Sequence, residues 1–166
     1  MGRTYNIVAE HQTMITAVNV LVGIYPVATP PAAGSVIAIN RVEITQSENA
    51  TSAMVRAALS ARTGGNLTVA TVTPSAAMYG GAVSAIAGVA GTLAAGKCGI
   101  TGSGDATPGY VDLVVADFNA LNGWLWIPTP SERIFITGAV AFVVRFLADP
   151  GTLLGWTCTV NYEEIY

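Results

Sequence analysis

The sequence predicts an all-β protein, an antiparallel β-sandwich of the jelly-roll kind, on three observations. Apolar residues recur with a period of two in several segments, which is the spacing of a strand with one buried face. β-Branched and aromatic residues dominate these segments and favour strand over helix. Turn-forming Gly, Pro and Asn residues interrupt the chain at short intervals, as in antiparallel sandwiches and barrels.

Four strands are expected in the first part of the chain, at residues 5–10, 17–25, 40–45 and 55–62. In the third of these, Val42 and Ile44 alternate with Arg41 and Glu43. Successive side chains of a strand point to opposite faces. The pattern therefore predicts that Arg41 and Glu43 stand together on one exposed face.

Three further strands are expected at residues 110–118, 140–147 and 156–163. The last has the cleanest alternation, because polar residues separate its apolar ones, which are Trp156, Cys158, Val160 and Tyr162. That pattern is typical of a half-buried antiparallel strand. Segment 140–147 is apolar on both faces except at Arg145. It suits a central strand, or a strand whose outer face another subunit covers.

Residues 75–109 are rich in Ala and Gly and interrupt this strand pattern. Glycines at positions 80, 81, 88 and 91 argue against a stable helix, so the segment is interpreted as a long loop or an added hairpin. Since 166 residues suit one domain, we expect a single sandwich domain spanning 1–166 that carries 75–109 as an insertion.

Charge is scarce: 52% of residues are apolar, 10% are charged, and the net charge is −3. Charged residues usually make up about 25% of a soluble domain. None occurs in residues 12–40 or 63–96, which suggests a surface covered by other copies or by a partner. This weak net charge gives no argument that the chain binds nucleic acid or a membrane surface. The uncharged stretches are too interrupted for a membrane span, and no secretory leader is recognised, so synthesis in the cytoplasm is expected.

Residues for catalysis or metal binding are few. His11 is the one histidine, and the Gly-x-Ser-x-Gly pattern of a nucleophile elbow is missing. Cys98 and Cys158 form no Cys-x-x-Cys motif, and whether they pair stays open. The run 102–105 (Gly-Ser-Gly-Asp) lacks the surrounding residues of a phosphate or calcium loop and is interpreted as a turn. We therefore predict no enzyme, no cofactor and no metal site.

Trp124 and Trp126 share one face of a short strand. Three interpretations stay open for them: core packing, an interface anchor, or a platform that stacks carbohydrate or nucleic-acid bases. Together with Arg41 and Glu43 they form the candidate interface that the sequence predicts.

The chain resembles a family of small tailed-phage and prophage virion structural proteins. The resemblance rests on segments in a shared order, at residues 3–5, 39–48, 55–56, 62–65, 74, 117–119, 123–124, 127–133, 143–150 and 162–165. The chain departs from the family at 79–109, which is longer and richer in Ala and Gly.

The resemblance implies a virion component without catalytic residues. The expected function is that of a capsid decoration (cement) protein, which binds the outer coat lattice and stabilises it. Its expected partners are the major capsid protein and further copies of itself, with a trimer favoured, and its expected location is the capsid surface. The alternatives are a tail, neck or coat subunit of the same particle, or a carbohydrate-binding sandwich used in attachment.

Overall fold

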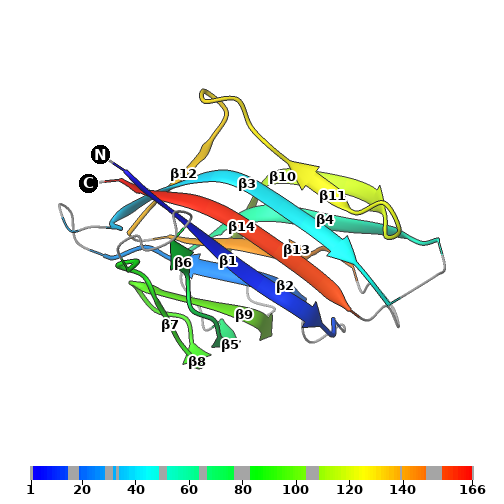
Figure 1. The fold of residues 1–166 in the computed structure, drawn as a ribbon, viewed down its shortest axis with the longest axis horizontal. Helices are drawn as coiled ribbons and strands as arrows, with labels where there is room; N and C mark the ends of the chain where they lie inside the picture. Colours follow the sequence, from blue (N-terminus) through cyan, green and yellow to red (C-terminus); the bar gives the residue numbers. More distant parts are fainter. Residues whose placement is uncertain are drawn as a thin grey trace.

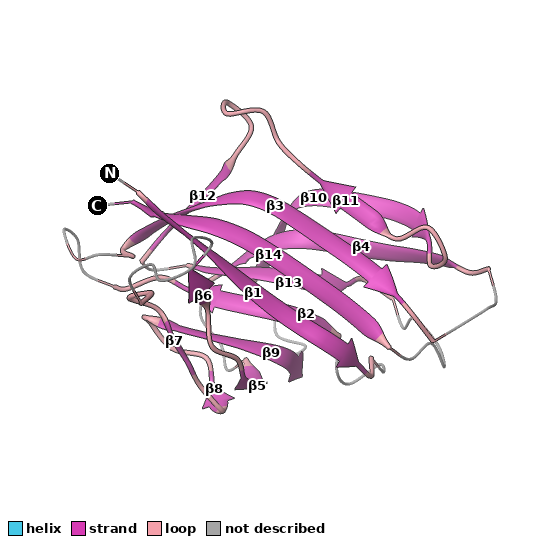
Figure 2. Ribbon diagram, viewed as in Figure 1, coloured by secondary structure: helices cyan, strands magenta, loops and turns pink. Residues whose placement is uncertain are grey.

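The structure is a computed structural model that describes residues 2–14, 19–28, 32, 34–48, 52–63, 67–76, 83–103, 109–138, 140–148 and 155–165. Fourteen strands and no helix occur in these ranges (Figure 2). No helix of the length and apolarity that a membrane span requires is found there. The strands are β1 Arg3–Gln12, β2 Val20–Tyr25, β3 Val36–Gln46, β4 Met54–Arg62, β5 Thr68–Thr71, β6 Ser75–Ala76, β7 Ala87–Gly88, β8 Gly91–Thr92, β9 Lys97–Ser103, β10 Tyr110–Asn119, β11 Trp124–Trp126, β12 Ile134–Thr137, β13 Ala141–Phe146 and β14 Trp156–Ile165.

The strands form two sheets that pack face to face (Figure 1). The first sheet has the order β11-β3-β14-β1-β6, with β12 pairing the same side of β3 as β11. The second has the order β10-β4-β13-β2-β9-β5-β8, with β7 also on β9. Without β5–β9, the sheets reduce to β11/β12-β3-β14-β1 and β10-β4-β13-β2, the interleaved arrangement of a jelly roll. The predicted fold class is confirmed.

β14 is the central strand of the first sheet, antiparallel to β3 on one side and to β1 on the other. Its residues alternate strictly between buried and half-buried, as the sequence predicts. Trp156 lies at the centre of the core, with its ring centroid 4.7 Å from that of Phe146 and 6.3 Å from that of Phe118. Both sheets contribute to this one cluster, so the large aromatic side chains join them.

β5 to β9 occupy the chain between β4 and β10, and β9 extends the second sheet beyond β2. The insertion predicted at 75–109 overlaps these strands, and its residues 77–82 and 104–108, including Asp105, lie outside the described ranges. A second, smaller cluster lies on the outer face of the second sheet. It comprises Val20, Leu67, Val69, Leu93, Ala141 and Val143.

Glycines make room for this second cluster. Gly23 on β2 and Gly99 on β9 face each other in register. A Cβ atom at Gly99 would lie 2.2 Å from Cγ2 of Val69, and one at Gly23 would lie 3.0 Å from Cδ2 of Leu93. Small residues here let a second layer of apolar side chains lie directly on the sheet.

The outer face of β13 is buried by this same chain. Val143 and Ala141 belong to the second cluster, while Phe142, Val144 and Phe146 face the main core. The sequence left open whether β13 is a central strand or a strand covered by another subunit. The structure places it centrally, between β2 and β4, and the insertion supplies part of its cover.

Candidate interaction surface

One edge of the sandwich is formed by β10 in the second sheet and by β11 and β12 in the first. Figure 1 shows β10 and β11 side by side at this edge. The ring of Phe118 on β10 stacks on that of Trp124 on β11, with centroids 6.1 Å apart. This contact joins the two sheets along the edge. We call the surface of β10, β11, β12 and the connections between them, with the adjacent Met54, the open edge.

Exposed apolar side chains concentrate on the open edge. Nine large apolar side chains are exposed among the described residues, and eight of them lie here, each 43–69% accessible. They are Met54, Val111, Leu113, Val115, Leu121, Leu125, Ile127 and Phe135. The ninth, Val83, lies in the insertion. Single exposed apolar residues are ordinary on a protein surface, whereas eight of them along one edge make this edge the candidate contact surface.

β10 is also an edge strand in the backbone sense. Within the described ranges it pairs with β4 alone, so its other side presents amide and carbonyl groups outward. A bulge at Leu113 interrupts its register with β4, between Asp112 and Val114. Bulges and charges limit unwanted strand pairing. The pairs Arg56–Asp117 (2.9 Å) and Arg145–Asp112 (2.8 Å) hold both acids of β10.

The connection between β11 and β12 projects from the sandwich as a loop (Figure 1). The carboxylate of Glu132 accepts hydrogen bonds from the Thr129 hydroxyl (2.7 Å) and backbone N–H (3.2 Å). These two bonds lower the pKa of the Glu132 carboxyl. The loop is thus braced by its own residues, and it presents Ile127 at its base.

Trp124 and Trp126 lie on the open edge but point inward. Both are half-buried and pack against the main core cluster. Leu125, between them, points outward and is 51% exposed. The shared face that the sequence predicts is present, and it packs on the core. The outward contact group at β11 is therefore Leu125, which the sequence reasoning did not select.

Arg41 and Glu43 stand on the outer face of the first sheet, as predicted, and form an ion pair with each other. Leu125 is the register partner of Glu43, so this pair adjoins the open edge. The structure thus brings all four candidate interface residues to neighbouring positions on β3 and β11. The two charged residues face solvent and the two tryptophans face the core.

A row of amides crosses the same outer face and was not anticipated. The Nδ2 of Asn161 donates to Oδ1 of Asn6 (2.7 Å), and the Nδ2 of Asn40 donates to Oδ1 of Asn161 (3.2 Å). Arg133 ends the row, with Nη1 3.1 Å from both Asn40 Oδ1 and Glu163 Oε2. The amides and Nη1 of Arg133 satisfy one another, so the row stabilises the sheet surface, while Nε of Arg133 is enclosed without a hydrogen-bond partner.

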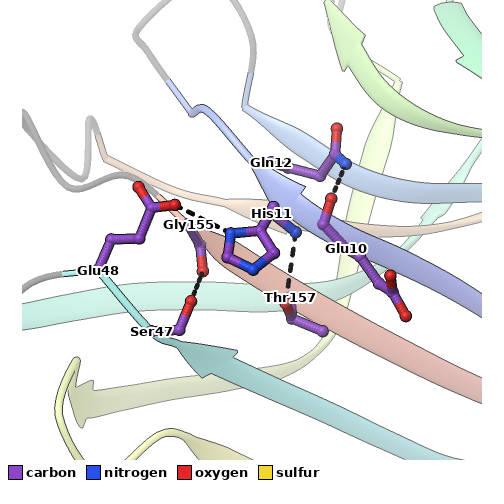
Figure 3. Close-up of polar contacts among 7 residues, drawn as sticks. All are labelled: Glu10, His11, Gln12, Ser47, Glu48, Gly155 and Thr157. Atoms are coloured by element: carbon purple, nitrogen blue, oxygen red, sulfur yellow. Dashed lines mark hydrogen bonds and ion pairs between the residues drawn. The ribbon is translucent and has the colours of Figure 1, made fainter.

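His11 lies at the end of β1, where its Nδ1 is 2.9 Å from Glu48 Oε1 (Figure 3). Its backbone N–H donates weakly to Thr157 Oγ1 at 3.4 Å. The backbone φ of His11 is 51°, in the left-handed region, where the register of β1 with β14 shifts. The imidazole is well exposed and has no Ser or Cys nucleophile among its described contacts, which fits the end of a strand better than a catalytic site.

Cys98 and Cys158 are both buried free thiols, so the question the sequence left open is answered. Burial raises the pKa of Cys98 to about 12, against a smaller opposing effect of the Lys97 charge. Burial also raises the pKa of Cys158. Neither thiol is set up as a nucleophile. In the described part of the chain, no group of three or more His, Cys, Asp or Glu side chains is arranged to hold a metal ion.

Comparison with known proteins finds no matching family model, no similar curated protein and no similar solved structure. The open edge is therefore interpreted from its own geometry. Its signal in the sequence is the run 110–119, where apolar residues occupy both faces of a strand that also carries two acids. An apolar run of that kind predicts a covered strand, and only the topology reveals that β10 lies at an edge.

Proposed function

We propose that this protein is a virion structural protein, a capsid decoration (cement) protein that binds the coat lattice through its open edge and stabilises it. The observation that carries the proposal is the concentration of exposed apolar side chains on one edge of the sandwich. The virion setting comes from the resemblance of the sequence to tailed-phage structural proteins. Jelly-roll folds serve many functions, including capsid domains and lectins, so the fold alone does not choose among them.

The proposed mechanism is mechanical. Apolar side chains of β10, β11 and β12 would be removed from water against coat subunits, which contributes about 25 cal/mol per Å² of apolar surface. A specific interface buries about 1,600 Å² in total, more than one row of side chains provides, so the projecting 127–133 loop is expected to contribute. Repeated copies on a symmetric lattice add avidity to each contact.

A different position on the particle, as a tail, neck or coat subunit, would use the same edge with a different copy number. Carbohydrate binding by Trp124 and Trp126 is less well supported. A sugar platform needs exposed aromatic faces, and here both rings pack against the core while Phe118 stacks on Trp124.

The first test is the copy number of this chain in gradient-purified particles of the virus that encodes it, measured by quantitative mass spectrometry against the major coat protein. A ratio near one, or a simple fraction such as one-third, is the expected result for decoration of the head. A few to a few dozen copies would assign the chain to the tail, neck or a vertex. Absence from washed particles would contradict the virion proposal.

The second test addresses the surface. Leu125→Glu combined with Phe135→Glu places two charges on the open edge and should weaken binding to particles lacking the protein at least a hundredfold. Val83→Glu is the matched control, because it also puts a charge on an exposed apolar position, but in the insertion. Equal binding by the native protein, the double variant and the Val83→Glu control would show that the coat contact lies elsewhere.

A further inference from the structure

Arg62 is a buried charged residue at the end of β4, and no acidic side chain among the described residues balances its charge. It is 5% exposed and lies on the outer face of the second sheet, in register with Tyr110 of β10 and Ala141 of β13. Glu164 is the other charged residue that is buried in the described ranges. The carboxylate of Glu164 accepts the Ala85 N–H at 3.1 Å and is hydrogen-bonded by Ser84, so it has the partners that a buried ion requires.

Arg62 has no such partner among the described residues. The other arginines of the same face are paired: Arg56 with Asp117 and Arg145 with Asp112. For Arg62 the structure gives one contact, in which the guanidinium carbon lies 5.2 Å from the centroid of the Tyr110 ring. A cation–π contact of this length does not replace the hydrogen bonds of a desolvated guanidinium, which has five N–H donors.

Counted over the described residues, the surroundings of Arg62 carry an excess of one positive charge. Arg145 lies 4.2 Å from the same Tyr110 centroid, and it donates to Ser60 Oγ (3.1 Å) and Asp112 Oδ1 (2.8 Å). Ser60 also donates to Asp112 at 2.6 Å. Asp112 therefore neutralises Arg145, and neither described acid of β10 is left to neutralise Arg62. Buried charges in proteins are normally paired, because an uncompensated one costs several kcal/mol.

We propose that Arg62 is the recognition group of a carboxylate-binding site, occupied in the assembly by an acidic side chain or C-terminus of the neighbouring protein. A planar carboxylate accepts two parallel N–H bonds from a guanidinium and supplies one negative charge, which balances the cluster. A phosphate carries about 1.5 to 2 negative charges at pH 7, which would exceed that balance beside Asp112. The identity of the partner rests on the proposed function, whereas the carboxylate site does not.

The position of Arg62 suits this role. Arg62 keeps 5% of its surface accessible, so it is not completely closed off from solvent. Tyr110 begins β10, the strand that forms the open edge. A protein that binds along that edge would therefore reach Arg62, beside the start of β10, through the same interface.

The test uses the full chain and acetate as the probe, at constant ionic strength with chloride as the reference salt. Acetate should raise the Tm of the native protein by about 2–3 °C near saturation. Arg62→Met should abolish that rise and leave the Tm in chloride unchanged or higher, because it removes an unbalanced buried charge. Arg56→Met is the matched control on the same strand, where Arg56 is exposed and already paired, and it should keep the full response to acetate.

Three results would overturn the proposal. A fall of several degrees for Arg62→Met in chloride, or its failure to fold, would mean that the chain itself supplies the missing partner. No acetate response in the native protein would mean that no site exists. A larger response to inorganic phosphate than to acetate would assign the site to a phosphate ligand.

Binding to particles separates this proposal from the proposed function. Arg62→Met should weaken particle binding at least tenfold, while Arg56→Met stays within twofold. If the Leu125→Glu, Phe135→Glu protein loses binding and Arg62→Met does not, the open edge is supported as the interface. The assignment of the carboxylate to the neighbouring protein is then wrong. If no protein binds particles but acetate still acts through Arg62, the carboxylate site stands and the virion proposal fails.

Discussion

The two edges of this sandwich are built in opposite ways. At the insertion edge, formed by β6 and by β5 and β7–β9, every strand except β9 has two to four residues, and the second cluster is buried there. At the open edge, β10 is ten residues long and keeps apolar side chains in solvent. Strands β5 to β9 thus lie at one edge, while the other edge stays apolar and exposed. Folding alone does not require that exposure, whereas the proposed binding to a coat lattice would use it.

The insertion edge is held to the sandwich by polar contacts that reach its interior. The Tyr162 hydroxyl lies 2.9 Å from Ser84 Oγ, and the Tyr5 hydroxyl donates to the Val83 carbonyl at 3.2 Å. Burial raises the pKa of Tyr162, against a lowering effect of the Ser84 bond. In the described ranges no hydrogen bond of this kind holds the outward apolar side chains of the open edge. Substitutions should therefore divide the molecule into regions that determine stability and a region that determines binding.

The largest loss of stability is expected in the core that both edges share. Trp156→Ala removes a fully buried ring from between Phe146 and Phe118 and should lower the free energy of unfolding by about 4 kcal/mol. Urea denaturation followed by circular dichroism measures this. A loss below about 1 kcal/mol would mean that the two sheets do not depend on this aromatic cluster.

The next effect is expected at the insertion edge. Gly99→Ala brings a Cβ to 2.2 Å from Val69 Cγ2 and 2.8 Å from the Ala70 carbonyl oxygen, so the backbone must shift. We expect about 2 kcal/mol of destabilisation in urea denaturation. Gly102→Ala, whose nearest contacts are 3.1 Å, is the graded control and should cost less. A larger destabilisation by Gly102→Ala than by Gly99→Ala would show that the second cluster does not lie on β9 as described.

The two thiols report on the two regions separately. Cys158 lies in the centre of the first sheet, and Cys98 lies on β9 beside the short strands of the insertion. Short strands open more readily, so native-state labelling with Ellman's reagent at pH 8 should modify Cys98 at least tenfold faster, a difference of about 1.4 kcal/mol in opening free energy. Cys98→Ala should remove the faster phase. If both thiols react at one rate, opening is global and the insertion edge is no weaker than the core.

A smaller effect on stability is expected at Asp112, one of the two paired acids of β10. Burial opposes ionisation of Asp112, but the hydrogen bonds from Ser60 and Arg145 and the charge of Arg145 outweigh it and lower the pKa of the carboxyl. A lowered pKa adds stability above the unfolded value of 3.8, and that stability is lost as pH falls through the folded pKa. Asp112→Asn should therefore cost about 0.5–1 kcal/mol at pH 7 and progressively less below pH 4. A cost that stays constant down to pH 2 would contradict this, and thermal unfolding across pH measures it.

The smallest effect on stability is expected where the effect on binding is largest. Leu125→Ser and Val115→Thr change exposed side chains of the open edge and should alter the free energy of unfolding by less than about 0.5 kcal/mol. Equilibrium denaturation of each variant is the measurement. A loss above 1.5 kcal/mol would mean that these residues support the fold and were not left exposed for a partner.

The sequence was sufficient for strands whose two faces differ. β14 and β3 show alternation because one face meets the core and the other meets solvent. It was less informative for β13 and β10, which are apolar on both faces for opposite reasons: β13 is buried on both sides, and β10 lies at an edge. Periodicity reports burial in a strand and carries no information on which strand lies beside it, so the open edge could not be located in advance.

The candidate site was predicted in part for the same reason. Trp124 and Trp126 were chosen by residue type, and the alternation correctly placed them on one face. Which face meets the core depends on the Phe118 ring, six residues away in sequence and in the other sheet. Likewise, no local pattern marks Arg62, because only the assembly of β4, β10 and β13 shows that it is buried without an acid from the described residues.

The most direct test of the open edge is amide hydrogen exchange of the free protein and of the same protein bound to its particle. If the open edge is the interface, peptides covering residues 110–137 gain strong protection on binding, while those covering 68–103 change little. Unchanged exchange at β10 and β11, with new protection in the insertion, would contradict it and assign the interface to the opposite edge of the sandwich.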